Sequence, residues 1–285
     1  MEVIFAPFGN SSEFYEKYSS SFDAPKYINS LSLNGYEYLC NEGVHISDDG
    51  CAILKENAEK YNIALSVRAY DFLNLSSEDE KIRKKGVKIL CDTVKKASLM
   101  GAKRVVFPLD NCAIRSRKSV YEHTLKSIDE VFLNLKENNT DDVFLCPETM
   151  GLIHDLGEVN EVISICKNND MLLPCFNAGN IYARSLGKDY SFEYYKNLIE
   201  KTEKKLGSYR SKNLHFYYSK VEYTHHGYKK DLNFCDCDDE NQSFFGLLKA
   251  VKYKGITPFI VCKSPDFSDK DCMMMKNHYN DEVLV

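Results

Sequence analysis

The residues that could do chemistry in this chain follow short apolar runs. Glu148 stands in the segment Leu-Cys-Pro-Glu-Thr-Met-Gly, residues 145–151. A carboxylate can act as a general base or help to hold a divalent metal, so Glu148 is the candidate catalytic residue. Arg68 and Lys263 follow other runs, where cations would bind an anionic group or pair with Glu148. The other candidates for a ligand-binding pocket are hydrogen-bonding groups: Asn177, Asn180 and His215.

The apolar runs themselves predict eight strands, at residues 3–7, 36–39, 63–67, 104–107, 143–146, 172–175, 214–218 and 258–261. Stretches with helical periodicity separate them, such as residues 78–100, which end at Gly101. This alternation predicts an α/β fold, a (β/α)8 TIM barrel in a single domain over residues 1–285. An open doubly wound sheet is the alternative, but no glycine-rich fingerprint follows the first strand. In a barrel the candidate residues would meet at the mouth, where the strands end.

Composition limits the classes of function. A net charge of −5 gives no broad basic face for nucleic acid, although a local basic groove stays possible. No stretch approaches the roughly 20 apolar residues that span a bilayer, and the N-terminus lacks a secretory signal, so we expect a cytoplasmic protein with no membrane partner. The eleven cysteines are scattered, which predicts reduced and mostly buried thiols.

Several segments resemble a known family. Ser-Val-Arg-Ala-Tyr at 66–70, followed by Asn-Leu-Ser-Ser at 74–77, is similar to the third-strand motif of the endonuclease IV family (AP endonuclease family 2). Residues 145–151, 174–180 and 257–265 resemble its fifth, sixth and eighth strands. These proteins belong to the xylose isomerase-like TIM barrels. The resemblance implies a barrel that binds divalent metals, typically zinc, and cleaves DNA beside abasic sites, whereas related barrels isomerise or epimerise sugars with one metal.

The chain departs from this family at most positions where a metal ligand is expected. The replacements, in chain order, are Arg68, Pro108, Asn177, Asn180 and Lys263. Glu148 and His215 keep ligand chemistry and are the residual metal candidates. Arginine is always protonated and cannot ligate a metal, so the pattern predicts a degenerate metal site with no confident cofactor. Zinc or another divalent metal would bind only if the site is partly rebuilt, for example by His225, His226 or Asp231 from the segment 225–238.

Three functions remain open. The first is a protein without metal-dependent catalysis, either inactive or binding a small polar ligand that is sugar- or phosphate-like, in which Glu148 holds the cations in place. The second is a metal-dependent abasic-site endonuclease that uses Glu148 and His215; DNA is a possible partner by resemblance only. The third is a sugar isomerase or epimerase.

Lys263 could form a Schiff base, but a nearby carboxylate would keep it protonated. The acidic segment 231–243 is expected either to cover the mouth or to be a solvated loop.

Overall fold

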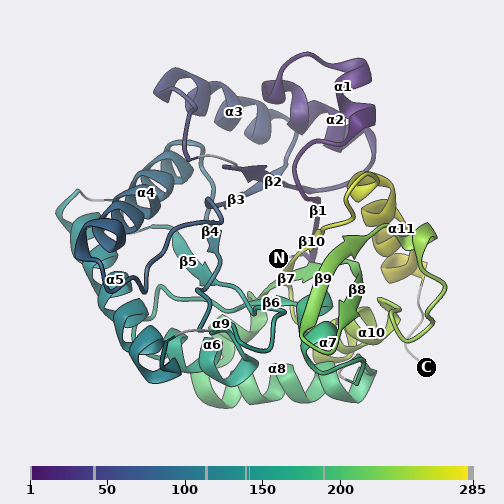
Figure 1. The fold of residues 1–285 in the computed structure, drawn as a ribbon. Coiled ribbons are helices and arrows are strands. Elements are labelled where there is room, and N and C mark those ends of the chain that lie inside the picture. Colours follow the sequence, from purple (N-terminus) through teal and green to yellow (C-terminus); the bar gives the residue numbers. More distant parts are fainter. Residues whose placement is uncertain are drawn as a thin grey trace.

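The alternation of short strands and helices builds a ring of eight parallel strands surrounded by helices (Figure 1). The computed structural model describes residues 2–40, 43–112, 115–138, 140, 142–188 and 190–281. The strands of the ring are β1 (Ile4–Pro7), β2 (Gly35–Leu39), β3 (Ala64–Arg68), β4 (Arg104–Phe107), β5 (Phe144–Pro147), β6 (Cys175–Asn177), β7 (His215–Tyr218) and β10 (Phe259–Cys262).

Two four-stranded parallel sheets make up this ring. Their strand orders are β1-β10-β7-β6 and β2-β3-β4-β5. A parallel bridge between Phe8 and Glu37 joins β1 to β2. Bridges from Leu145 to Leu172 and from Glu148 to Cys175 join β5 to the β6 region. The strands therefore close on themselves, which confirms the predicted barrel and excludes the open sheet.

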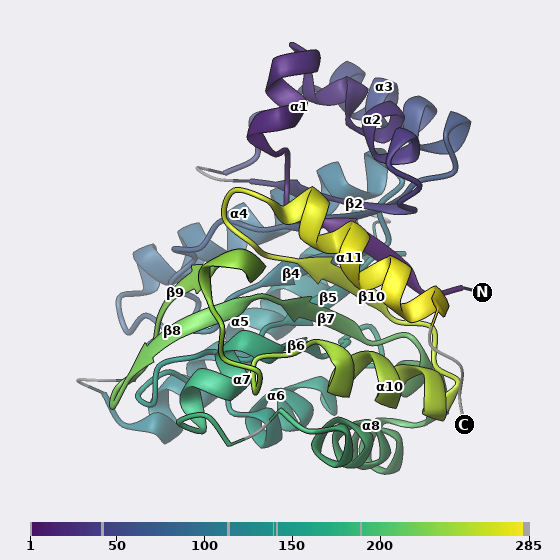
Figure 2. The ribbon, with the colours of Figure 1, turned by 90° about the vertical axis from the view of Figure 1, so that its right-hand side faces the viewer.

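Helices cover the outside of the ring, as the view from the side also shows (Figure 2). Several begin at a serine whose hydroxyl accepts a backbone N–H of the first turn; Ser116, for example, accepts from Ser119 N at 3.1 Å. Among the described residues, none of the helices is long and apolar enough to cross a membrane. The helices are α1 (Ser12–Lys17), α2 (Ala24–Ser30), α3 (Asp48–Lys60), α4 (Glu80–Leu99), α5 (Arg117–Glu137), α6 (Val159–Cys166), α7 (Ala178–Arg184), α8 (Phe192–Leu206), α9 (Ser208–Lys212), α10 (Phe245–Lys254) and α11 (Ser268–Asp281).

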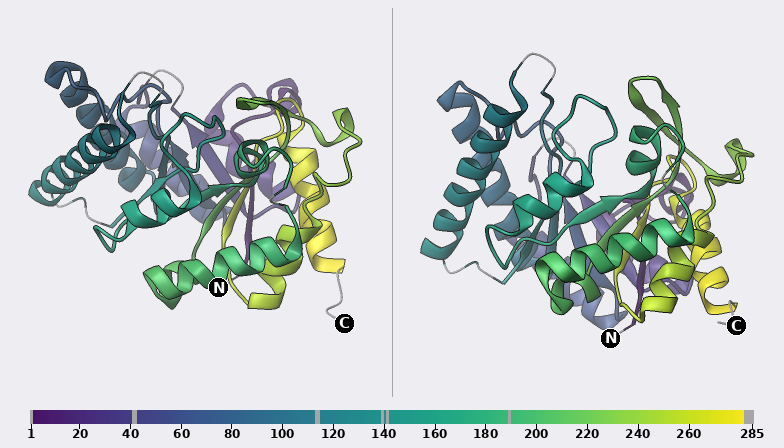
Figure 3. Two further views of the ribbon diagram at one scale, coloured as in Figure 1. Left: turned by 60° about the horizontal axis from the view of Figure 1, so that its bottom comes forward. Right: turned by 90° about the horizontal axis from the view of Figure 1, so that it is seen from below.

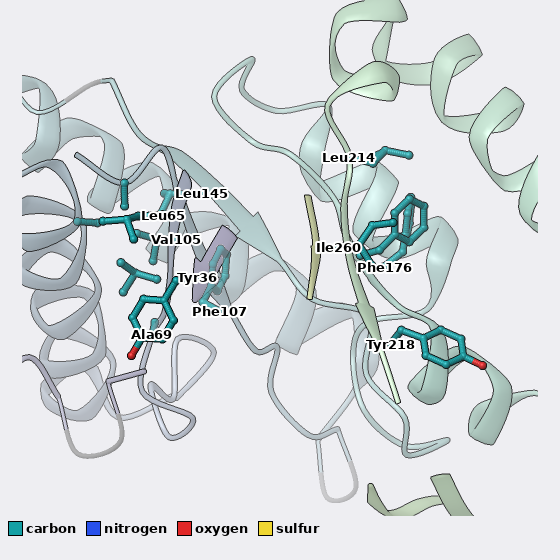
Figure 4. Packing of buried hydrophobic residues seen from close by; sticks show 14 of the residues in the cluster. Tyr36, Leu65, Ala69, Val105, Phe107, Leu145, Phe176, Leu214, Tyr218 and Ile260 are labelled. Atoms are coloured by element: carbon teal, nitrogen blue, oxygen red, sulfur yellow. The ribbon is translucent and has the colours of Figure 1, made fainter. Parts of the chain in front are cut away.

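Side chains along each strand alternate between two packed layers. Val105 and Phe107 belong to the large core between strands and helices, whereas Val106 belongs to a smaller cluster inside the ring. This period of two follows from the pleat, which points successive side chains to opposite faces. Figure 4 shows outward-facing residues such as Leu65 and Phe176 on strands of both sheets. Polar residues at inward positions must therefore lie inside the barrel or at its mouth.

An antiparallel hairpin, which the sequence did not predict, follows β7. Its strands are β8 (Lys220–Thr224) and β9 (Gly227–Leu232). Gly227 has a φ of +99°, and a Cβ there would lie 2.2 Å from the carbonyl oxygen of Gly151. Only glycine fits this turn and this approach. His225 and His226 are exposed at the turn.

Candidate functional site

The carboxyl ends of β3, β5, β6 and β10 bring together five of the six predicted pocket residues, with Glu148 at the centre of the other four. The side chain of Glu148 is only 2% exposed. Its Oε2 accepts a hydrogen bond from Nη1 of Arg68. Its Oε1 accepts from Nδ2 of Asn177 at 2.7 Å and lies 3.4 Å from Nδ2 of Asn180. Nζ of Lys263 is 4.0 Å from the same oxygen. Every neighbour of this carboxylate in the cluster is a donor or a cation.

Local structure fixes the two asparagines. Asn177 is the N-cap of α7, and its Oδ1 accepts the backbone N–H of Asn180 at 3.1 Å. Its Nδ2 is thereby left to point at Glu148. Nδ2 of Asn180 also donates to the carbonyl of Thr149 at 2.9 Å. Both amides are buried and already have structural hydrogen bonds, so they orient Glu148 as well as facing the mouth.

Arg68 uses its second edge to bind Asp71. Nε and Nη2 donate to Oδ1 of Asp71 at 3.2 and 2.8 Å. The Asp71 side chain is 65% exposed, whereas that of Arg68 is 9% exposed. Burial lowers the pKa of the guanidinium, but Glu148, Tyr217 and Asp71 outweigh this and raise the pKa well above its usual value. Arg68 is a fixed cation whose outer edge meets a solvent-exposed partner.

Lys263 is held by two aromatic rings and two carboxylates. Its ammonium lies 5.1 Å from the ring centre of Phe8 and 5.2 Å from that of Tyr217, within cation–π range. Oδ2 of Asp231 is 3.7 Å away. Burial lowers the pKa of Lys263, and Asp231 and Glu148 more than offset this, so the pKa is raised. The amine is therefore protonated and unsuited to attack a carbonyl.

His215 lies elsewhere in the barrel. It is the first residue of β7, at the amino-terminal end of the strand, and is fully buried. Its ring stacks on Phe259 at 5.2 Å, and its Nε2 is 3.5 Å from Oε1 of Glu37. Neither ring nitrogen has a hydrogen bond. Burial, followed by the charges of Arg104 and Arg68, holds its pKa well below the usual value. His215 is a neutral residue of the barrel interior that faces Glu37.

The sequence analysis did not identify two acidic residues, Glu37 in the barrel interior and Asp71 beside Arg68. Glu37 is fully buried in the middle of β2, where its Oε1 accepts from the hydroxyl of Ser66 at 3.0 Å. Burial raises its pKa to about 7, against the lowering effect of Tyr217. Alternation along β2 could have identified Glu37 as inward-facing, because the neighbouring Tyr36 packs in the outer core. Asp71 had a weaker signal, its position three residues beyond Arg68.

Potential metal ligands are dispersed. Within the described ranges, no three or more His, Cys, Asp or Glu side chains are grouped so that they could hold a metal ion. Of the residues weighed as substitutes from the segment 225–238, Asp231 reaches the mouth, but it accepts from the Ser219 hydroxyl at 2.6 Å and faces Lys263. Pro108, at the end of β4, has neither a ligating side chain nor a backbone N–H.

Comparison with known proteins agrees with this fold. A family model described as xylose isomerase-like TIM barrel matches residues 26–274. An uncharacterized protein of Methanocaldococcus jannaschii is 27% identical over 260 residues, which cover 91% of this chain and 92% of that protein.

Solved structures also resemble this chain in fold. Endonuclease IV from Thermus thermophilus superposes with a TM-score of 0.71 at 15% identity, covering 98% of this chain and 100% of the other. D-Psicose 3-epimerase from Clostridium cellulolyticum has a TM-score of 0.68 at 13% identity, covering 97% and 98% of the two chains. At such identities the likeness establishes the fold and leaves the reaction open.

Proposed function

Since the chain belongs to the xylose isomerase-like TIM barrel family, we propose that it has kept the barrel but binds a small sugar- or phosphate-like ligand at the mouth without the metal centre of its relatives. One observation carries this proposal. Both oxygens of Glu148 are already bonded by protein donors, Arg68 and Asn177, and Lys263 stands 4.0 Å away. The carboxylate that would ligate a metal instead neutralises cations of the protein.

Electrostatics favour this proposal over a metal site. Two unit charges 4 Å apart repel by about 4 kcal/mol at an effective dielectric of 20, and a dication doubles this. A metal ion beside Glu148 would meet such repulsion from Arg68 and from Lys263. It would also have to displace the hydrogen bonds that Glu148 accepts. The donor set therefore does not fit a divalent metal, and we propose that Glu148 is a positioning residue rather than a catalytic base or ligand.

The outer edge of Arg68 is the proposed contact for the ligand. Its two N–H groups bind a single oxygen of Asp71, whose side chain is 65% exposed. Because Asp71 is largely exposed, water can solvate its carboxylate when a ligand takes its place on Arg68. A phosphate or carboxylate oxygen pair would take the same edge with two parallel hydrogen bonds. Lys263 would supply the second charge, and Asn180 could meet a sugar hydroxyl.

Metal analysis and ligand titration test the proposal together. We expect the purified protein to hold less than one zinc, manganese or iron ion per chain by mass spectrometry. Calorimetry with inorganic phosphate, a pentose, a hexose and their phosphates should detect binding that Arg68→Gln and Lys263→Met each weaken. Lys229→Met, which alters an exposed ion pair with Glu222, serves as the matched control and should bind normally.

Three outcomes would overturn the proposal. Two or more tightly held ions per chain would contradict the metal-free mouth. Chelator-sensitive cleavage of an abasic duplex, or chelator-sensitive epimerisation of a ketose, that is lost in Glu148→Gln would establish one of the metal-dependent alternatives. Absence of binding to every compound in the panel would leave the barrel without the proposed ligand function.

A further inference from the structure

A groove beside the barrel combines an apolar wall, in which Phe245 and Met274 are exposed, with an acidic rim. Its volume is about 630 Å³, and its apolar walls are Phe234, Phe244, Phe245 and Met274. These residues come from the segment between β9 and α10, from the start of α10 and from α11. Figure 3 shows this segment, in green to yellow-green, at the edge of the molecule rather than above the ring of strands. Much of the acidic stretch is exposed, as expected for a solvated loop, and residues 234–240 contribute to the lining of this groove.

The walls of the groove are fixed by hydrogen bonds to the barrel. The backbone N–H of Phe234 donates to Oδ2 of Asp271 at 2.9 Å, and that oxygen also accepts from the Ser264 hydroxyl. The hydroxyl of Tyr182 donates to Oδ2 of Asp239 at 2.8 Å. The ammonium of Lys220 donates to the carbonyl of Cys237. The partners lie on α7, on β8 and on α11, so several elements of the barrel hold the walls of the groove in place.

Half of the apolar wall is exposed to solvent. The side chains of Phe245 and Met274 are 52% and 54% exposed, although Phe244 beneath them is 9% exposed. The rings form a stepped platform, with centroids 5.4 Å apart for Phe234 and Phe244 and 4.9 Å apart for Phe244 and Phe245. Rigid aromatic rings at a concave surface are typical of sites that bury one large side chain of a partner.

The acidic rim of the groove indicates which kind of partner would bind there. Three carboxylates line the rim, those of Asp238, Asp239 and Glu240. The one ammonium among the lining residues, Lys220, already donates to a carbonyl. We propose that this groove binds a basic segment of another protein that inserts a large apolar side chain between Phe245 and Met274 and places lysine or arginine against the rim. This inference is independent of the function proposed for the mouth.

Fluorescence anisotropy with short labelled peptides tests the groove. The probe carries leucine and phenylalanine flanked by lysines; one control peptide has glutamates for the lysines and another has serines for the apolar residues. We expect the lysine probe to bind at least about tenfold more tightly than either control, and Phe245→Ser to weaken it by a similar factor. Leu133→Ser removes an apolar side chain that is 63% exposed on α5, and it should bind like the wild type. Equal binding by the wild type and Phe245→Ser, equal binding of all three peptides, or no binding of the lysine probe would overturn the proposal.

A thiol in the groove gives a second readout. Among the eleven cysteines, all of them described, Cys235 is the exposed one, and it lines the groove. Saturating lysine probe should slow maleimide labelling of Cys235 at least about tenfold, because the bound peptide would cover the thiol. Binding that leaves the labelling rate unchanged would place the peptide elsewhere. Light scattering that shows a dimer lost in Phe245→Ser would instead assign the groove to a second copy of this chain, and would overturn the proposed occupant.

Discussion

Replacing Glu148 by glutamine should destabilise the protein far more than an isosteric change usually does. The carboxylate accepts from Arg68 on one oxygen and from Asn177 on the other, so the new amide group must face a donor whichever way it turns. The substitution also leaves the Arg68 guanidinium, 9% exposed, without its buried counter-charge. Breaking a buried ion pair from one side costs roughly 3–5 kcal/mol, and we expect Glu148→Gln to fall in this range.

Urea unfolding at neutral pH measures this cost, and a double-mutant cycle assigns it. Arg68→Met and Glu148→Gln together should cost at least about 1 kcal/mol less than the sum of the single changes, because the second change removes the charge that the first left unpaired. Glu222→Gln is the matched control, because its partner Lys229 is 54% exposed. This substitution should lower the free energy of unfolding by less than about 1 kcal/mol. A cost of Glu148→Gln no greater than that of the control, or strict additivity in the cycle, would refute the ion-pair account of the mouth.

Three further predictions concern other parts of the barrel. The pKa of Glu37 is raised to about 7 by burial, so the folded protein keeps a proton that the unfolded chain releases above its ordinary pKa; this glutamate's contribution to stability should therefore fall as pH rises from about 4.5 to 7. The free energy of unfolding of Glu37→Gln, measured in urea, should therefore rise by up to about 3 kcal/mol relative to that of the wild type between pH 4.5 and pH 8. A difference between the two proteins that does not change with pH would contradict a raised pKa for Glu37. Gly86→Ala should destabilise by at least about 2 kcal/mol despite a better helix former, because the added Cβ would lie 1.8 Å from the Leu73 carbonyl oxygen; Lys84→Ala in the same helix should be nearly neutral by thermal melting. Finally, borohydride with a panel of carbonyl compounds should leave Lys263 unmodified at neutral pH, since its pKa is raised, and an adduct found there by peptide mass spectrometry would show an available neutral amine.

The elements that could be predicted are those whose pattern is local. Helix α4 lies within residues 78–100, where the sequence shows helical periodicity, and β4 coincides with its apolar run at residues 104–107. The sixth strand is displaced: residues 172–175 were expected, but β6 spans Cys175–Asn177. Pro174 lacks the N–H that a ladder needs, so Leu172 makes one isolated bridge before the regular strand begins. The β8–β9 hairpin contains many polar residues and no apolar run, so the sequence pattern did not predict its strands.

For the site, sequence identified the residue types and the structure determined the partners. The resemblance and the strand pattern placed Arg68, Glu148 and Lys263 at strand ends, and strand ends meet at the mouth of a barrel. The resemblance and the strand pattern could not predict which donor bonds to which oxygen of Glu148. They also could not predict that Asp71 accepts hydrogen bonds from the outer edge of Arg68.

The sequence by itself determined the barrel, because periodicity and alternation act over a few neighbouring residues. Tertiary structure alone decided the charge balance of the mouth and the position of His215. Arg68 and Glu148 are 80 residues apart in the chain, and their contact depends on the register of β3, β4 and β5 within a closed ring. Such register follows from the packing of all eight strands together, and no segment of the chain contains it.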